Sequence, residues 1–207
     1  MVKLLIASKN QKKYSELKKI IETLLAFDGK KLFELVSLND FPLVEEVEED
    51  GSTFEENAIK KAIGYARQTN LLTLADDSGI SIDALDGEPG VHSARFAGPN
   101  KNDFDNCYKV LSLMEKVEEP KRTGRFECVI AIAEPGKIVG TAYGKVEGMI
   151  LKEMRGRGGF GYDPIFYYPP FAKTLAQASS EEKNKVSHRG KALARAVDIL
   201  RNFICKS

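Results

Sequence analysis

The chain has 207 residues, and its 31 basic and 30 acidic residues leave a formal charge of only +1 at pH 7, which argues against a nucleic-acid partner. Its three cysteines form neither a CxxC pair nor a zinc-ligand pattern, which favours reduced thiols in a cytoplasmic protein. The first apolar residues turn polar too early for a signal peptide or a membrane span, so we expect no membrane partner.

Strand-like and helical patterns alternate along the first part of the chain. Ser52 with Glu55, or Thr53 with Glu56, forms a capping-box signal at the start of the second helix. In chain order we expect a strand at 2–7, a helix at 11–27, a strand at 32–38, a helix from about 53 to 68, and a strand at 71–75 that is broken at 76–79 and resumes at 80–83.

The second part begins with a loop rich in glycine and proline and continues with helical and alternating runs. In chain order we expect a loop at 86–100, a helix at 102–116, strands at 125–133 and 138–146 joined by a hairpin turn at 134–137, a glycine-rich loop at 155–162, a strand at 164–168 and a helix at 187–204. The mixture predicts an α/β fold with a mixed sheet flanked by helices. Neither a repeat nor a linker is visible, so we expect one domain over residues 1–207.

A basic loop separates the first predicted strand from the first predicted helix. A helix N-terminus offers free N–H groups and a favourable dipole to a phosphate. Side chains could add hydrogen bonds and positive charge through Ser8, Lys9, Asn10, Gln11, Lys12 and Lys13. The loop lacks the spacing of a Walker A motif, and a capped helix with a solvated basic first turn is the alternative interpretation.

Carboxylates cluster at two places, in the acidic loop 45–50 and at Asp76-Asp77 after an apolar strand. Adjacent acids near an apolar surface repel each other unless a cation or a shared proton relieves them. Mg²⁺ binds one or two carboxylates together with substrate phosphates, and another carboxylate can activate water. The alternative is a polar turn at the aspartates and a solvated acidic loop.

The glycine-rich loop contains the GxGxxG spacing at Gly156, Gly158 and Gly161, but no buried strand precedes it and Asp163-Pro164 prevents a following helix. We therefore reject a dinucleotide-binding motif. Phe160 is suited to stack on a planar base, and Asp163 could bond to the edge of that base. A flexible loop is the alternative.

The segment 181–190 groups several donors. His188 and Arg189, with Lys183 nearby, could contact carbonyl oxygens or phosphates, although a lone histidine is more often structural. A phosphate-binding loop, a carboxylate centre, a base-stacking loop and a donor cluster together indicate a nucleotide site.

The motifs, in this order, resemble those of the inosine triphosphate pyrophosphatase family, also called the Ham1-like family. They are SKNQKK at 8–13, TFEENA at 53–58, DDSG at 76–79, GFGYDP at 159–164 and SHRG at 187–190. The resemblance implies an elongated fold of two lobes with a nucleotide cleft between them, and a homodimer. It also implies Mg²⁺-dependent cleavage of ITP, dITP and XTP to the monophosphate and pyrophosphate, which cleanses the nucleotide pool.

The resemblance also assigns roles to residues. Asp77 would be the general base and a metal ligand, supported by Asp76, and Glu49 would hold Mg²⁺, with Glu46 and Glu48 as alternatives in the alignment. Lys13 and Lys61 would contact the triphosphate. The substrate-binding set would be Ser8, Lys9, Asn10, Gln11, Lys12, Lys13, Lys61, Ser78, Phe160, Gly161, Tyr162, Asp163, Lys183, His188 and Arg189.

Selectivity for the purine base follows from hydrogen bonding. A donor such as His188 or Arg189 facing O6 would favour keto purines, whereas adenine would place a donor against a donor at a cost of roughly 1–3 kcal/mol. Two other functions stay open: a Maf-like pyrophosphatase acting on modified pyrimidine or guanine nucleotides, and a non-catalytic nucleotide-binding or RNA-binding module.

Overall fold

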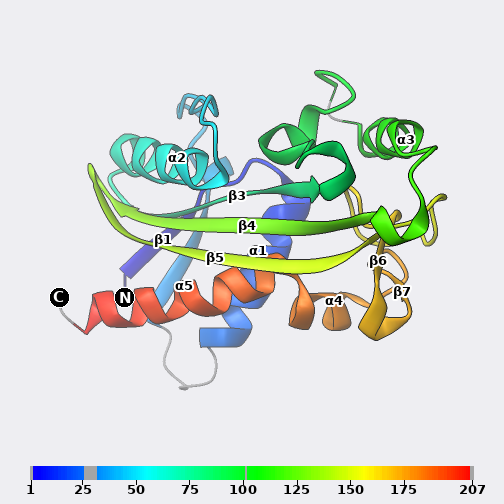
Figure 1. Ribbon diagram of the computed structural model, residues 1–207. Coiled ribbons are helices and arrows are strands. Elements are labelled where there is room, and N and C mark those ends of the chain that lie inside the picture. Colours follow the sequence, from blue (N-terminus) through cyan, green and yellow to red (C-terminus); the bar gives the residue numbers. More distant parts are fainter. Residues whose placement is uncertain (1, 26–31, 101, 206–207) are drawn as a thin grey trace. The chain divides into compact units, whose positions relative to one another are not determined.

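A mixed β-sheet is the framework of the computed structural model, which describes residues 2–25, 32–100 and 102–205 (Figure 1). Among these residues the sheet has seven strands, in the order β2-β1-β3-β4-β5-β6-β7. β1 pairs in parallel with β2 and β3, whereas β6 pairs antiparallel with β5 and β7, so the predicted mixed α/β fold is confirmed. The strands are β1 (Val2–Ile6), β2 (Phe33–Ser37), β3 (Leu72–Ile82), β4 (Thr123–Glu134), β5 (Lys137–Ile150), β6 (Phe166–Tyr168) and β7 (Lys173–Thr174).

Polar side chains cap the starts of the first four α-helices, where backbone N–H groups lack partners within the helix. Asn10, Thr53, Asn102 and Ser179 each accept such a bond. The α-helices are α1 (Gln11–Leu25), α2 (Phe54–Thr69), α3 (Asp103–Leu113), α4 (Ser180–Val186) and α5 (His188–Ile204). Short 3-10 helices are η2 (Leu38–Asp40), η3 (Asp83–Leu85), η4 (Gly90–Arg95), η5 (Glu119–Lys121) and η6 (Pro169–Phe171).

The described residues divide into two compact units. β3, β4 and β5 each contribute residues to both units. The prediction of one domain over the whole chain, with a cleft between two lobes, stays a prediction. Unit 1 comprises the described residues 2–25, 32–77, 128–144 and 189–205, and unit 2 comprises the described residues 78–100, 102–127 and 145–188.

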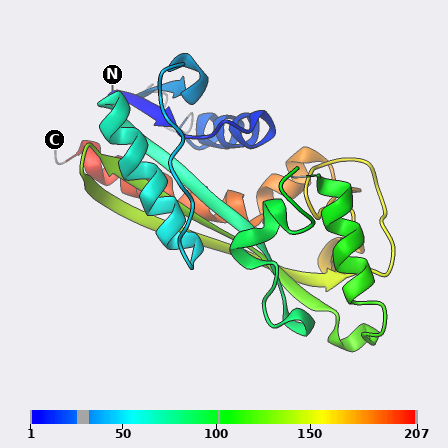
Figure 2. The same ribbon diagram turned by 90° about the horizontal axis from the view of Figure 1, so that it is seen from above.

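In unit 1 the strands bury side chains on both faces, as the alternation of strand side chains requires. Leu4 and Ile6 face a core shared with α1 and α5, whereas Leu5 faces the core beneath α2. α2 presents alanines at every fourth position to the sheet, which lets its backbone lie close: Ala58, Ala62 and Ala66. Figure 2 shows an irregular segment, residues 41–53, running along the outside of α2.

In unit 2 the core lies around α3 and the neighbouring strand segments. Phe126 of β4 packs against Phe166 of β6 with ring centroids 4.7 Å apart, and Cys107 and Val110 of α3 complete this core. The buried Arg122 guanidinium donates hydrogen bonds to the carbonyl oxygens of Ile150 and Leu151 at 2.8 Å each. An arginine that would be costly to bury unpaired is thus satisfied by backbone oxygens.

One strand prediction was wrong in a way that matters for the site. We expected the run from Asp76 to Gly79 to interrupt a strand, but β3 is continuous from Leu72 to Ile82. Both aspartates are buried within it and have partners on the two faces of the sheet. Because their carboxylates are satisfied inside the fold, the chain has no need to turn towards solvent there.

Other elements differ mainly in their ends. The hairpin turn is confirmed, with Gly136 at φ +85, but β4 and β5 extend beyond the predicted strands because their pairing continues where the alternation weakens. α3 ends at Leu113, and α4 was missed although Ser179 and Glu182 form a capping box. The predicted end of the first helix, at Phe27, lies outside the described residues. Within the described residues, none of the helices has the length and apolarity needed to cross a membrane.

Candidate active site

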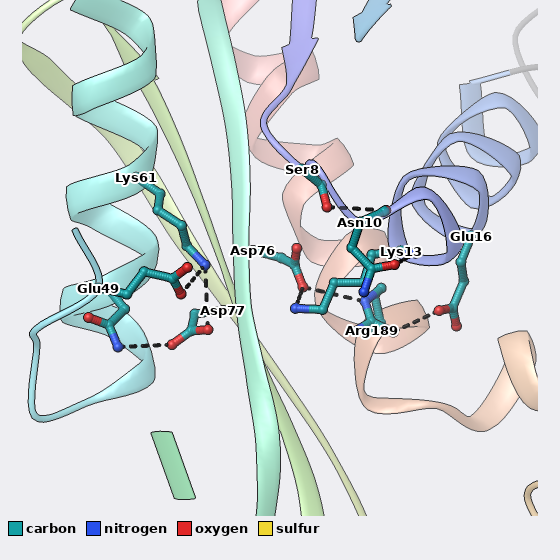
Figure 3. A network of polar contacts seen from close by, with 10 residues as sticks. Ser8, Asn10, Lys13, Glu16, Glu49, Lys61, Asp76, Asp77 and Arg189 are labelled. Atoms are coloured by element: carbon teal, nitrogen blue, oxygen red, sulfur yellow. Dashed lines mark hydrogen bonds and ion pairs between the residues drawn. The ribbon is translucent and has the colours of Figure 1, made fainter. Parts of the chain in front are cut away.

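Asp76 and Asp77 leave β3 on opposite faces (Figure 3). Successive strand side chains alternate in this way. Asp76 contacts residues of α1 and α5, and Asp77 contacts residues of α2. Both are nearly buried, with exposed fractions of 3% and 7%. In the sequence they form one carboxylate set, but their geometry gives them separate surroundings.

Asp76 is surrounded by cations. Its Oδ2 lies 3.4 Å from Lys13 Nζ and 3.5 Å from Arg189 Nε. Burial raises the pKa of this carboxyl, but the charges of Lys13, Arg189 and Lys61 outweigh burial and hold the pKa well below its usual range. Asp76 is therefore a fixed negative charge that anchors α1 and α5 to the strand.

The partner of Arg189 that the sequence analysis missed is Glu16. Arg189 Nη1 lies 2.7 Å from Glu16 Oε2, and the arginine is only 1% exposed. Glu16 follows Lys13 by three residues on α1, so both project from the same side of the helix. The spacing of Lys13 and Glu16 is visible in the sequence, but the pairing of Glu16 with the distant Arg189 is not. The guanidinium predicted to contact substrate here holds two carboxylates.

Asp77 lies between two side chains of α2. Asn57 Nδ2 donates to Asp77 Oδ2 at 3.2 Å, and Lys61 Nζ lies 3.5 Å from Asp77 Oδ1. Lys61 Nζ also lies 2.8 Å from Glu49 Oε2, so one ammonium bridges two carboxylates (Figure 3). Asn57 and Lys61 are four residues apart and share one face of the helix.

The charge balance around Asp77 differs from that around Asp76. Burial raises the pKa of Asp77, and Glu49 and Asp76 add to this, so that Lys61 and Lys13 do not bring it back to its usual value. Burial lowers the pKa of Lys61, but the nearby carboxylates outweigh burial, and the net shift is upward. The result is a charged lysine beside a carboxylate that binds a proton more readily than an ordinary aspartate.

The donors beside Lys61 suit a magnesium ion. Asp77 and Glu49 supply carboxylate oxygens, the hard ligands that Mg²⁺ prefers. In the described part of the chain, no group of three or more His, Cys, Asp or Glu residues is arranged to hold a metal. A metal at Asp77 and Glu49 would therefore take further oxygens from substrate phosphates or water. Of the acidic-loop alternatives, Glu46 and Glu48 are exposed, and Glu49 reaches Lys61.

The predicted phosphate loop leads from β1 into the N-terminus of α1. Asn10 Oδ1 accepts the Lys13 N–H at 3.2 Å, and Ser8 Oγ donates to the Asn10 carbonyl oxygen at 3.4 Å. Lys9 and Gln11 are exposed, and the Lys12 side chain lies outside the described residues. The first turn of α1 thus places backbone N–H groups and the Lys13 ammonium on one side of the strand, where Asp76 lies.

In unit 2 the glycine-rich loop is held together by Asp163. Its Oδ2 accepts from the Phe160 N–H at 2.9 Å and lies 2.5 Å from Lys183 Nζ. The same ammonium lies 4.5 Å from the centroid of the Phe160 ring. Gly159 has φ +71, and a Cβ there would stand 2.0 Å from Asp163 Oδ2, so glycine is required. The loop is built around this ion pair and places an aromatic ring beside it.

Two predicted contact residues of this loop have structural roles. Tyr162 is 3% exposed, and its hydroxyl donates to the Ser93 carbonyl oxygen at 2.7 Å. The Gly161 N–H donates to Asp103 Oδ2 at 2.8 Å, which ties the loop to the start of α3. Tyr162 therefore supports the loop from the core.

His188 belongs to the same unit as this loop. Its ring stacks on Phe126 at a centroid distance of 4.9 Å and an angle of 12°, and it is 5% exposed. Phe126 was not singled out by the sequence analysis, since it reads as one apolar position of a strand. Ser78, another predicted contact, is half-buried on β3.

Known proteins resemble this chain over nearly all of its length. A model of the Ham1 family matches residues 4–199. A "dITP/XTP pyrophosphatase" of Desulforamulus reducens is 52% identical over 199 residues, covering 96% of each chain. A protein of the same name from Bacillus subtilis is 46% identical over 200 residues, covering 97% of this chain and 98% of its own.

Solved structures agree in fold. A HAM1 protein from Coxiella burnetii is 41% identical with a TM-score of 0.86, covering 98% of this chain and 100% of the other. The Ham1 protein of Staphylococcus aureus is 39% identical with a TM-score of 0.81, covering 98% and 97%. With the two-faced aspartate pair, the glycine-rich loop and these matches in place, the chain belongs to the Ham1 family.

Proposed function

We propose that this chain hydrolyses non-canonical purine nucleoside triphosphates, such as ITP, dITP and XTP, to the nucleoside monophosphate and pyrophosphate. The observation that carries the proposal is the buried Asp77, which shares the Lys61 ammonium with Glu49. The names of the relatives from Desulforamulus reducens and Bacillus subtilis support the substrate class. A nucleotide is therefore the expected partner.

Magnesium is the cofactor that the donor set fits. Asp77 and Glu49 would hold the ion, and the Lys61 ammonium between them would then be available to the triphosphate. When bound, Mg²⁺ neutralises phosphate charge and favours attack on phosphorus by water. The two carboxylates are too few to enclose a metal alone, so binding of metal and triphosphate should be coupled.

Asp77 is suited to accept a proton from the attacking water. In the metal-free protein burial raises the pKa of Asp77, so that this carboxylate accepts a proton more readily than an ordinary aspartate. The hydrogen bond from Asn57 fixes one carboxylate oxygen, which orients the group. Water loses a proton to Asp77 and forms a bond to phosphorus, while the bond between the α and β phosphates breaks and pyrophosphate leaves.

The triphosphate would be bound by cations and N–H groups at the start of α1 and on α2. Lys13 lies beside Asp76 at the start of α1, where the helix dipole also favours an anion. Lys61 supplies a second positive charge. Ser8 and Asn10 lie in the loop that enters the helix and complete this set.

The purine would be bound by the glycine-rich loop and His188. The Phe160 ring can stack on a base, and the Asp163–Lys183 pair fixes the loop that carries the ring. His188 is the donor assigned to O6. We assign Arg189 instead to holding Glu16 and Asp76, because its guanidinium is committed to those carboxylates.

The test is pyrophosphate release from ITP, XTP, GTP, ATP and dTTP, with and without Mg²⁺, with identification of the nucleotide product. We expect monophosphate from ITP and XTP in the presence of Mg²⁺ and slow turnover of GTP and ATP. A preference for dTTP would indicate the Maf-like function, and binding without turnover would indicate a non-catalytic module. Release of orthophosphate would contradict the proposed cleavage.

The remaining expectations concern assembly and location. We propose a homodimer that acts in the cytoplasm. Sedimentation equilibrium of the purified chain tests the first, and fractionation of cells that express it tests the second. A monomer at micromolar concentration would contradict the dimer.

A further inference from the structure

The segment that carries Glu49 is extended but belongs to none of the strands. Residues 44–51, here called the strap, lie along α2 without regular secondary structure (Figure 2). From Val47 onward the strap alternates: Val47, Glu49 and Gly51 are partly buried, whereas Glu48 and Asp50 are exposed. This is the pattern of an extended chain with one face on a surface.

Side chains of α2 bind the outer end of the strap through its backbone. Gln68 Oε1 accepts the Glu45 N–H at 2.8 Å, and Gln68 Nε2 donates to the Glu45 carbonyl oxygen at 3.2 Å. The Val47 N–H donates to the Tyr65 hydroxyl at 3.4 Å. These bonds hold the backbone whatever charge the strap side chains carry.

The inner end is bound through the backbone of Gly51 and through the side chain of Glu49. The Gly51 N–H donates to Asn57 Oδ1 at 2.7 Å, and Glu49 Oε2 lies 2.8 Å from Lys61 Nζ. Taken together, strap residues 51, 49, 47 and 45 meet helix residues 57, 61, 65 and 68 in reverse order. Two residues of extended chain advance about 6.6 Å and one helical turn about 5.4 Å, so the repeats nearly match.

Gly64 makes room for the strap. A Cβ at this position would stand 2.6 Å from Val47 Cγ2, and the β-branched valine has little freedom to move away. Glycine is unfavourable inside a helix, so its presence in α2 fits a need for close approach. Val47 thus fits over Gly64 and marks one register of the strap.

Register matters because the strap is acidic throughout. A slip by one residue would turn Glu48 or Asp50 towards Lys61 in place of Glu49, since extended side chains alternate. Attraction to the Lys61 ammonium cannot choose among these carboxylates. The neutral contacts of Gln68, Tyr65 and Gly64 can select one register, because they fix the backbone of the strap.

We propose that Gln68, Tyr65 and Gly64 are positioning residues that fix the register of the strap and thereby hold the Glu49 carboxylate beside Asp77. The metal-binding part of this inference rests on the proposed function. The ion pairs of this network join Lys61 to Glu49 and Asp77 (Figure 3), whereas the contacts of Gln68, Tyr65 and Gly64 described above are with the strap, so we infer that they act through Glu49.

The test compares Gln68→Ala, Tyr65→Phe and Gly64→Ala with Arg67→Ala, a matched control whose exposed side chain lies on the same turn of α2. Hydrogen exchange of the strap amides in metal-free protein measures directly how firmly the strap backbone is held. Calorimetric titration with Mn²⁺, in the presence of a non-hydrolysable ITP analogue, measures the affinity of the site for metal. The Mg²⁺ concentration for half-maximal pyrophosphate release is compared with kcat at saturating Mg²⁺.

We expect faster exchange in residues 45–51 and metal affinity weakened by about tenfold for the three variants, as for other supports of metal ligands. Their kcat at saturating Mg²⁺ should stay within about twofold, because Asp77 itself is untouched. Arg67→Ala should match the wild type. Adding Val47→Ala to Gly64→Ala should restore metal affinity, because it removes the clashing methyl groups.

Two results would overturn the positioning role: unchanged exchange in the strap, or faster exchange with unchanged metal affinity. A folding defect would lower both the melting temperature and the kcat at saturating Mg²⁺, and Arg67→Ala would not share it. Such a defect would likewise count against a specific role for the three residues. A wild type that is inert towards ITP would overturn the proposed function, whereas hydrogen exchange of the strap amides in metal-free protein would still decide whether the three residues hold the strap.

Discussion

The two faces of β3 give neighbouring aspartates opposite surroundings. On one face, Lys13 and Arg189 pair with Asp76 and lower its pKa. On the other, Lys61 is shared between Asp77 and Glu49, and burial leaves the pKa of Asp77 raised. The same residue type therefore has a lowered pKa where two cations pair with it, and a raised pKa where it shares one cation with a second carboxylate.

The largest expected effect is on turnover. Asp77→Asn should lower kcat by about 100-fold to 10,000-fold, because a general base contributes that much. The amide keeps the size of the side chain and one oxygen that can face a metal, so binding of a non-hydrolysable ITP analogue should persist at saturating Mg²⁺. Steady-state kinetics and calorimetry measure the two quantities. Turnover within tenfold of the wild type would remove Asp77 as the base.

Asp76→Asn should instead act on stability. Removing this carboxylate leaves the buried Arg189 and the neighbouring Lys13 with one partner fewer, which should cost about 3 kcal/mol in free energy of unfolding. Urea unfolding measures the loss, with Asp77→Asn as the matched control. Equal losses for the two variants would contradict the division of roles between the faces.

A smaller effect is expected on base selectivity, for which the adjacent residues His188 and Arg189 are assigned different roles. His188→Ala should reduce the ratio of kcat/KM for ITP over ATP by about tenfold, because one donor to O6 is lost. Arg189→Ala should lower both values together, since Arg189 holds Glu16 and Asp76. Competitive assays with both nucleotides give the ratio. An unchanged ratio in His188→Ala would remove its assignment to O6.

The smallest effect is a difference in pH dependence. The pKa of Asp76 is lowered from 3.8 by folding, so its stabilisation is present above that pH and fades as pH falls below it. The pKa of Asp77 is raised from 3.8, so its charged form opposes folding increasingly as pH rises above that value.

Unfolding in metal-free buffer from about pH 3 to pH 7 should reveal both signs. The stability lost in Asp76→Asn should shrink towards the acid end. Any stability gained in Asp77→Asn should grow towards neutral pH. Parallel curves for the two variants would show that the two faces do not differ in charge balance.

Local patterns in the sequence predicted much of this protein. Helical periodicity located α1, and a capping signal located the start of α2, where Thr53 accepts the Glu56 N–H although the Glu56 carboxylate accepts the Ser52 N–H and not the Thr53 N–H. Glu134-Pro135-Gly136-Lys137 formed the expected turn. Of the site residues, Asp77 was predicted from the adjacent carboxylates, whereas Lys61 was predicted only from the resemblance to the family. These features depend on neighbours within a few positions, which is why a sequence displays them.

Only the tertiary structure decided which groups meet. It kept β3 continuous, placed its aspartates on opposite faces, and joined Arg189 to Glu16 across most of the chain. It also selected Glu49 from an acidic run in which several carboxylates look equivalent. The physical reason is that burial and charge pairing act between distant segments, whereas propensity and periodicity describe one segment at a time.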